Sequence, residues 1–396
     1  MLDLNQVVGQ IEKIGRESFR EREEQDEKLE AGEQAISKIA AAPEEFVEKV
    51  TASAGRVLWP VARPLESVSQ TLGVSPYTTP VTVVGVDGSQ IMPSHHEVHT
   101  CYLLNIGYVV ISYGLNAKPV LETHPHLFHR PDDLYPLVDR RRVHIDELYV
   151  SLERNLLELS TLAQVSIKSQ ERGAPVVAFV DGSLIPWSVE KLSERYQKSF
   201  LERMSTEMDL FRKHRIPLFG YLSNSRATDV INMLRVALCP YDLSDCRQHC
   251  SAINEEDFPC SRIWPLSDRQ LFFDSLQKGQ RAPVFLSDAE VTRRWEAGDR
   301  ICFSYLNVGT EIARLEFPHW LFEEKDLLDR GFSVAFSQAG KGMGYPVCLS
   351  EAHHLAIIRG SERQKFFELL ATHMVNLGLP KIRTSPKENR KRIGFV

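Results

Sequence analysis

The chain has 396 residues, of which 43% are hydrophobic and 25% are charged, and its formal net charge is −6. This composition suits a globular protein with one large core or two modest domains, and it excludes a histone-like coat for nucleic acid while allowing a local basic channel. No apolar run approaches the roughly 20 residues of a membrane span, and the N-terminal residues lack a signal-peptide pattern, so we expect a cytoplasmic protein without membrane association.

The N-terminal segment 1–56 is predicted to form a helical arm. Val7, Ile11 and Ile14 recur at helical steps, and the charged run "REREEQDEKLEAGEQ" follows them. Such a run favours a solvated helix, although pairing of this helix with a partner is the alternative. Prolines in the stretch 60–80 then separate the arm from the rest of the chain.

From residue 81 onward, short apolar strands alternate with amphipathic helices. Strands are expected at 81–86, at 99–114 (as one or two strands), at 174–180 and at 216–223. Helices are expected at 144–170, 188–214 and 224–238. This alternation predicts an α/β fold with a mixed sheet flanked by helices.

Two aspartates stand at matching places in two of these strands. Asp87 lies in "VVGVDGSQ" (83–90) and Asp181 in "VVAFVDGSLIPW" (176–187). We expect both strands to end at a turn here, where functional groups of α/β sheets gather. If the strands are neighbours, the two carboxylates repel each other unless a divalent cation lies between them. A pair of metal ions could then promote phosphodiester cleavage. The alternative is that Asp-Gly-Ser is only a turn sequence.

Further motifs support a family resemblance. They are "YLNVGTEIARLEFPHWLF" (305–322), "GYPVCLSEAHHLAIIRGSERQKFF" (344–367) and "TSPKENRKR" (384–392). Together with the two aspartate motifs, they resemble the NurA nuclease family over 81–396. The resemblance implies an RNase H-like fold, a homodimer and a HerA-like hexameric translocase as partner. It also implies manganese-dependent 5′–3′ exonuclease and single-strand endonuclease activity on DNA, in end resection and repair, with Mn²⁺ or Mg²⁺, two ions in all, as cofactor.

The resemblance also implies site residues. Asp87 and Asp181 correspond to metal ligands of the family. A helix glutamate corresponds to Glu158, with Glu153 as a rival, and a histidine corresponds to His353, with His354 adjacent. Carboxylates with one imidazole form a mostly oxygen-donor set, which suits Mn²⁺ or Mg²⁺.

DNA-binding residues are expected in two places. Arg226 follows the third short strand, where family members often carry a basic residue. The C-terminal tail holds six basic residues against Glu388, an excess of five positive charges (6 − 1 = 5), where phosphate contacts would concentrate. Within it we expect DNA contacts from Lys387, Lys391 and Arg392. The alternative is a solubilising tail.

Four of the seven cysteines lie in a predicted insertion at 239–260. Clustered cysteines in a cytosolic protein favour a structural Zn²⁺ site or an iron–sulfur cluster, although the spacing matches no standard template. These residues are Cys239, Cys246, Cys250 and Cys260. His249 could replace one ligand, and the alternative is four reduced thiols. The remaining three cysteines, Cys101, Cys302 and Cys348, lie in apolar segments and are expected in the core.

Two other functions are compatible with the same pattern. The first is a catalytically inactive adaptor that binds DNA and docks on a HerA-like translocase. The second is an actin-like ATPase, whose fold also carries two Asp-Gly turns, although the threonine and the glycine-rich adenosine element usual in such proteins are missing here.

Overall fold

A computed structural model describes residues 3–93, 100–138 and 140–378 of the chain. The chain forms two compact units. Unit 1 comprises Met1–Ser75 and Leu222–Phe322, and unit 2 comprises Pro76–Tyr221 and Glu323–Val396. Residues 222–322 group with the N-terminal segment in unit 1. The expected division into an arm at 1–56 and a nuclease domain at 81–396 stays a prediction.

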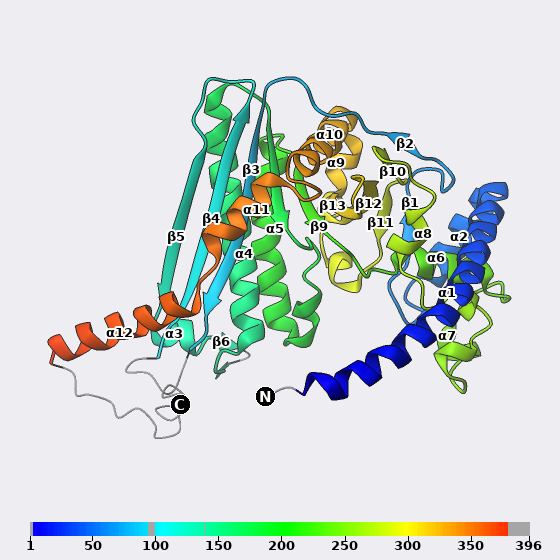
Figure 1. Cartoon of the computed structure of the whole chain (residues 1–396), viewed down its shortest axis with the longest axis horizontal. Coiled ribbons are helices and arrows are strands. Elements are labelled where there is room, and N and C mark those ends of the chain that lie inside the picture. The colour runs from blue at the N-terminus through cyan, green and yellow to red at the C-terminus, as the bar shows by residue number, and fades with distance from the viewer. Residues whose placement is uncertain (1–2, 94–99, 139, 379–396) are drawn as a thin grey trace. The chain divides into compact units, whose positions relative to one another are not determined.

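Unit 2 is built on a mixed sheet in the order β9-β8-β3-β4-β5 (Figure 1). Strands β3 (Val81–Ile91), β4 (Tyr102–Tyr113) and β5 (Val120–Phe128) pair antiparallel in chain order. Strand β8 (Val176–Asp181) joins β3 in parallel, and β9 (Leu218–Leu222) joins β8 in parallel. Three antiparallel strands followed by two parallel ones form the RNase H-like arrangement, so the expected fold class is confirmed.

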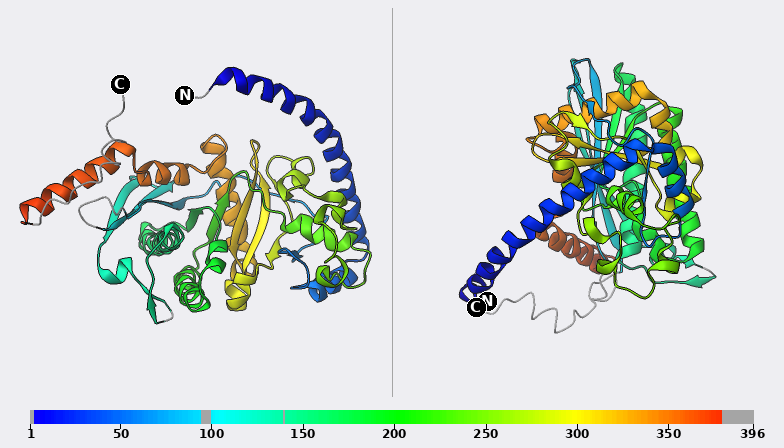
Figure 2. Two further views of the ribbon diagram at one scale, coloured as in Figure 1. Left: turned by 90° about the horizontal axis from the view of Figure 1, so that it is seen from below. Right: turned by 90° about the vertical axis from the view of Figure 1, so that its right-hand side faces the viewer.

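Helices cover both faces of this sheet. Helices α4 (Glu147–Ser169) and α5 (Glu194–Lys213) lie on one face and are seen end-on in Figure 2, left, whereas α11 (Val347–Ala356) lies on the opposite face. The helix expected at 144–170 is confirmed as α4. The helix expected at 188–214 begins only at Glu194, because a short 3-10 helix (Trp187–Lys191) precedes it. Unit 2 also contains α3 (Pro131–Leu134), the β6–β7 ribbon (Leu137–Val138 and Arg141–Arg142), α10 (Lys325–Lys341) and α12 (Gly360–Asn376).

Helix α11 packs unusually close to the sheet because two glycines face it. A Cβ atom added at Gly85 would lie 2.6 Å from the carbonyl oxygen of Cys348, and one added at Gly107 would lie 2.6 Å from that of Ala352. Side-chain atoms essentially cannot approach backbone this closely. The two glycines therefore let the backbone of α11 rest directly on β3 and β4.

Unit 1 combines helices from both ends of its sequence with a small antiparallel sheet. The strand order is β1-β11-β12-β13, and β10 pairs with both β12 and β2. The strands are β1 (Ala62–Pro64), β2 (Leu72–Gly73), β10 (Gln280–Arg281), β11 (Phe285–Ser287), β12 (Ile301–Asn307) and β13 (Ile312–Pro318). The helices are α1 (Leu4–Ala41), α2 (Pro43–Ser53), α6 (Asp229–Leu238), α7 (Cys246–His249), α8 (Asp268–Phe273) and α9 (His319–Glu323).

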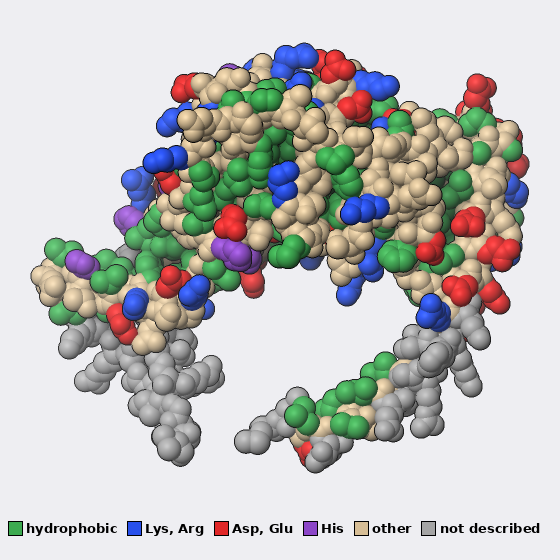
Figure 3. Space-filling model, turned by 45° about the horizontal axis from the view of Figure 1, so that its top comes forward, with side chains coloured by type: hydrophobic (Ala, Val, Ile, Leu, Met, Phe, Trp, Pro, Cys, Tyr) green, Lys and Arg blue, Asp and Glu red, His purple; other side chains and the backbone are tan. Residues whose placement is uncertain are grey.

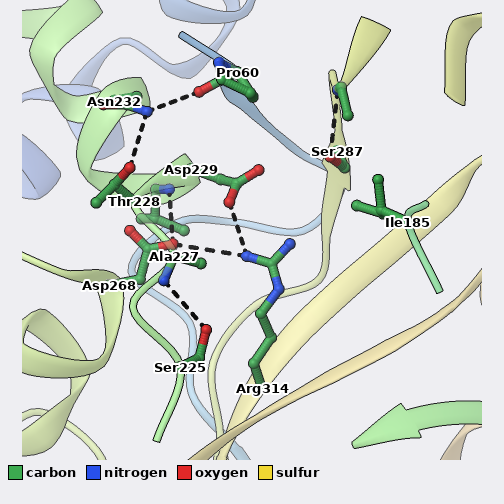
Figure 4. Close-up of polar contacts among 12 residues, drawn as sticks. Pro60, Ile185, Ser225, Ala227, Thr228, Asp229, Asn232, Asp268, Ser287 and Arg314 are labelled. Carbon is green, nitrogen blue, oxygen red and sulfur yellow. Dashed lines mark hydrogen bonds and ion pairs between the residues drawn. The ribbon is translucent and has the colours of Figure 1, made fainter. Parts of the chain in front are cut away.

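A buried ionic network holds unit 1 together (Figure 4). Arg314 is 1% exposed, and its guanidinium lies 2.9 Å from Asp229 and 2.8 Å from Glu316. Asp268 accepts hydrogen bonds from the backbone of Val230 and Ile231, which are otherwise unsatisfied N–H groups at the start of α6. Because buried charges are stable only when paired, loss of Arg314 would leave several carboxylates without their cation.

The helical arm expected at the N-terminus is present as α1 and α2, which are separated by Ala42 before Pro43. The first part of α1 exposes apolar side chains along the helix (Figure 3), namely Leu4, Val8, Ile11 and Ile14. Among the helices of the described residues, none combines the length and the apolar composition needed to cross a membrane.

The close packing of α11 against the sheet predicts that a methyl group added at Gly107 destabilises the protein. Gly107→Ala would push α11 away from the sheet and should lower the free energy of unfolding by roughly 1–3 kcal/mol. Denaturant unfolding of the variant measures this loss. Gly340→Ala is the matched control, because an added Cβ there meets nothing within 4 Å. Equal stability of the two variants would contradict the close approach.

Candidate metal centre

Asp87 and Asp181 are brought side by side by the register of two parallel strands. Val86 of β3 pairs with Val180 of β8, so the next residue on each strand is the aspartate. Neighbouring strands lie only about 4.8 Å apart, and residues at matching positions point to the same face. Burial raises the pKa of Asp181, and the nearby Asp87 carboxylate adds to the rise. The convergence of these two side chains, expected from sequence, is therefore present.

The two Asp-Gly-Ser motifs differ in backbone structure. The second motif is a turn as expected: β8 ends at Asp181, and Gly182 adopts φ 104°, a conformation that favours glycine. The first motif is not a turn, and that prediction was wrong. Strand β3 continues to Ile91 because β4 pairs with it along its whole length.

Gly88 is needed in the first motif for space and not for a turn. A Cβ atom on Gly88 would lie 2.5 Å from Oε1 of Glu158 and 3.0 Å from Cγ of Arg154. These two side chains come from α4, on the face of the sheet opposite α11. The missing side chain of Gly88 therefore lets Glu158 approach the strand ends.

Glu158 is the third carboxylate of the site. It is 5% exposed, and burial raises its pKa to about 8, with Asp87 and Asp181 adding to the shift and Arg154 opposing it. The Nε atom of Arg154 lies 3.1 Å from Oε1 of Glu158. Within the described part of the chain, this Oε1 atom has no hydrogen-bond partner of acceptable geometry. A buried carboxylate oxygen in this state is suited to bind a cation.

Glu153, the rival glutamate, is engaged elsewhere. Arg203 holds it with two hydrogen bonds of 2.7 and 2.8 Å, and Tyr196 donates a third at 3.2 Å. Five residues along a helix correspond to a rotation of about 140°, so Glu153 and Glu158 point in different directions. The structure thus brings Glu158, and not Glu153, toward the aspartates.

His353 approaches the site from α11. Its Nδ1 atom lies 2.7 Å from Oδ2 of Asp87. The C-terminal end of α11 is held in place by Ser89 and Asn105, whose side chains donate hydrogen bonds of 2.5 and 2.8 Å to the carbonyl of Ala356. His354 is also exposed on this helix, with its ring centroid 6.4 Å from that of His353. The contact with Asp87 is made by His353.

Two residues of the site were not predicted from sequence. Tyr345 hydrogen-bonds Asp181, which opposes the upward shift of the Asp181 pKa that loss of hydration causes. Burial raises the pKa of Tyr345, and the carboxylates of Asp181 and Asp87 add to the rise. Arg154 faces Glu158 from the preceding turn of α4. The spacing of four residues between Arg154 and Glu158 is a detectable ion-pair signal, whereas nothing near Tyr345 in the sequence indicates its contact with Asp181.

The structure does not test the remaining predicted DNA contacts. Arg226 is exposed in the segment between β9 and α6 and belongs to unit 1, whereas the carboxylates and His353 belong to unit 2. Lys387, Lys391 and Arg392 lie outside the described residues. Contact of these side chains with DNA therefore stays a prediction.

The cysteines of 239–260 gather in unit 1. Cys246, Cys250 and Cys260 are buried in one cluster with Phe258, and all four cysteines line a cavity of about 20 Å³. Burial raises the pKa of Cys246 to about 11. Zinc or iron–sulfur binding by these thiols stays a prediction, which elemental analysis of the purified protein would decide. The expectation that Cys101, Cys302 and Cys348 are core thiols is confirmed, because all three are buried.

The suitability of the clustered site residues for a metal ion depends on the ligand atoms that they offer. Among the described residues, no three His, Cys, Asp or Glu side chains are already arranged to hold an ion. Repulsion from neighbouring carboxylates nevertheless contributes to the raised pKa values of Glu158 and Asp181. A bound cation would relieve this repulsion. Asp87, Asp181, Glu158 and His353 therefore fit a hard divalent ion chemically, once their side chains adjust.

An RNase H-like sheet with clustered carboxylates on two adjacent strands is typical of enzymes that hydrolyse phosphodiester bonds with divalent metals. The model of the NurA domain matches residues 81–358, and the chain therefore belongs to the NurA family. Membership of this family supports the assignment of the chain as a nuclease, which is a hydrolase that acts on the phosphodiester bonds of DNA. Nucleases of this family depend on metal ions in general.

Among the solved structures that are similar to the chain, two each share 13% sequence identity with it. The NurA nuclease from Sulfolobus solfataricus has a TM-score of 0.47, with 80% of this chain and 89% of that chain covered. The catalytic domain of human Endonuclease V has a TM-score of 0.32, with 84% and 96% covered. No curated protein matches the chain.

The raised pKa of Glu158 predicts a pH-dependent stability. The unfolded chain releases this proton near pH 4.5 and the folded chain near pH 8, so the free energy of unfolding of the parent falls as pH rises between these values. Glu158→Gln does not titrate. Its stability relative to the parent should therefore increase by roughly 2–4 kcal/mol from pH 5 to pH 8, at about 1.4 kcal/mol per pKa unit.

Denaturant unfolding with a metal chelator present measures this difference. Glu153→Gln is the control: it loses the Arg203 ion pair but retains Glu158, so its own free energy of unfolding should still fall as pH rises from 5 to 8. A pH-independent difference between Glu158→Gln and the parent would contradict the buried state of Glu158.

Proposed function

We propose that the chain is a divalent-metal-dependent DNA nuclease whose active site is formed by Asp87, Asp181, Glu158 and His353. The observation that carries the proposal is the register of β3 and β8, which sets Asp87 beside Asp181. The buried glutamate from one face of the sheet and the histidine from the other complete the group. Such an assembly of like charges is unfavourable without a cation, so a structural role alone does not account for it.

Asp87, Asp181, Glu158 and His353 would hold the metal, with Mn²⁺ or Mg²⁺ suited to their oxygen-rich donor set. When bound, two such ions would supply Lewis-acid stabilisation of the phosphate and a hydroxide nucleophile near neutral pH. The carboxylate of Asp87 orients the imidazole of His353 through Nδ1, which leaves Nε2 to exchange a proton or bind an ion. The guanidinium of Arg154, beside Glu158, is placed to attract a phosphate oxygen.

The finer activities follow the family resemblance. We propose 5′–3′ exonuclease activity at linear DNA ends and endonuclease activity on single strands, in end resection and repair. A HerA-like hexameric translocase as partner and a homodimer belong to the same proposal. The exposed apolar side chains of α1 are compatible with either kind of association.

The proposal predicts that Asp87→Asn retains the fold and DNA binding but loses cleavage by more than about 100-fold, because a metal ligand becomes neutral. The measurement is manganese-dependent release of nucleotides from linear DNA. Glu153→Gln is the control and should cleave like the parent, since Glu153 pairs with Arg203. Parental activity in Asp87→Asn would overturn the assignment. A parent without any cleavage would favour the DNA-binding adaptor, and ATP turnover without DNA would favour the ATPase.

A further inference from the structure

A cavity opens next to two of the carboxylates of the candidate site. It has a volume of about 330 Å³ and lies within unit 2, between α4, α5 and the segment that follows β8. We call it the α4–α5 pocket. Side chains that define it include Arg154, Glu158, Asp181, Trp187, Phe200 and Met204. Glu158 and Asp181 line the pocket and also belong to the candidate metal centre. Any group in the pocket therefore lies directly beside that centre.

The pocket is lined by both apolar and polar side chains. Phe200, Leu159, Leu184 and Ile185 are buried in its wall. Its polar lining comes from the carboxylates of Glu158 and Asp181 and from Arg154, Asn155, Ser183 and Ser188. Trp187 is 39% exposed, so part of its indole surface is open to a ligand. This combination of apolar walls with few polar groups is typical of small-molecule sites.

The segment after β8 is fixed by its own hydrogen bonds. The backbone N–H of Ile185 donates to Oγ of Ser183 at 3.0 Å, and that of Trp187 donates to the carbonyl of Ile185 at 2.9 Å. The 3-10 helix that begins at Trp187 then continues the chain. These hydrogen bonds preorganise this side of the pocket, which reduces the conformational entropy that is lost when a ligand binds.

We propose that the α4–α5 pocket binds the base of one unpaired nucleotide adjoining the phosphate that is cleaved, with Trp187 as a stacking surface. This inference rests on the proposed nuclease function. It assigns to that function a base-binding subsite and a positioning residue, Trp187.

The location and the size of the pocket support a base as its occupant. In a DNA strand, the apolar group nearest to a phosphate is the base of an adjoining nucleotide, so a pocket that shares carboxylates with the phosphate site receives a base. The volume lies at the lower end of the roughly 300–1,000 Å³ of ligand sites, which suits one nucleoside. A paired base is already stacked and cannot enter, whereas frayed ends and single strands present it with little energetic penalty.

The chemistry of the lining favours the same occupant. An exposed indole stacks on any base, because every base has a π-face, so binding would be tolerant of sequence. Arg154 contributes a positive charge to the lining, beside Glu158. Within the described residues its buried Nε atom makes no hydrogen bond of acceptable geometry, although it lies 3.1 Å from Glu158. The cation can therefore turn toward the phosphate of the same nucleotide.

The test combines one protein change with one substrate change. Cleavage of a single-stranded oligonucleotide by the parent is compared with cleavage of oligonucleotides that carry an abasic nucleotide, placed in turn at each position within two nucleotides of the cleaved bond. We expect roughly ten-fold slower cleavage for one of these positions, in line with the contribution of base stacking. Trp187→Ala should slow cleavage of the intact oligonucleotide by a similar factor, mainly through a higher KM.

The losses in cleavage rate caused by Trp187→Ala and by the abasic nucleotide should not multiply, because both changes remove the same stacking contact. Trp187→Ala should therefore cleave the abasic and the intact oligonucleotide at similar rates, and Trp187→Phe should restore most of the difference. Tyr135→Ala is the matched control, since Tyr135 is an aromatic residue of unit 2 that is also 39% exposed and does not line the pocket. It should show the full effect of the abasic position.

Three results would overturn the pocket assignment while leaving the nuclease proposal intact. They are full-rate cleavage of every abasic oligonucleotide by the parent, independent and multiplying effects of the two changes, and an effect of Tyr135→Ala equal to that of Trp187→Ala. The abasic series needs no variant, so it decides the question even if Trp187→Ala does not fold. Absence of any cleavage by the folded parent would instead refute the nuclease function on which the inference rests.

Discussion

The register between β3 and β8 is the constraint on which the candidate site depends. Parallel pairing of Val86 with Val180 forces the following residues, Asp87 and Asp181, to stand next to each other. A shift of one residue in either strand would send one carboxylate to the opposite face of the sheet. The register is in turn set by buried apolar residues on both strands, so the core of unit 2 fixes the position of two charged groups at its edge.

Glu158 and His353 can approach the two aspartates because glycines in the sheet leave space for them. Gly85 and Gly107 allow α11 to lie close to β3 and β4, and His353 can then contact Asp87. Gly88 leaves room on the opposite face for Glu158. The sheet thus separates a glutamate on α4 from a histidine on α11, and the glycines let both approach the same pair of aspartates. Burial disfavours the ionised form of Glu158, as its raised pKa indicates.

The parts of this arrangement that are local could be predicted from sequence. Alternation of strands and helices, and the recurrence of Asp-Gly-Ser after apolar runs, led to the fold class and to the convergence of Asp87 and Asp181. Continuation of β3 through its Asp-Gly-Ser could not be predicted, because pairing with β4 overrides the turn preference of the motif. Whether Glu153 or Glu158 faces the site, and that Tyr345 contacts Asp181, depends on tertiary contacts that a single sequence does not contain. The same holds for the α4–α5 pocket, whose walls come from three separate elements.

The central claim is that Asp87 and Asp181 share a divalent cation, and Mn²⁺ binding measured by electron paramagnetic resonance of the free ion tests it most directly. Parent, Asp87→Asn and Asp181→Asn are titrated under the same conditions. The account predicts that each single change weakens binding of the same ion by more than about ten-fold, and that neither single variant keeps a site of parental affinity. Parental affinity in either single variant would contradict a shared ion.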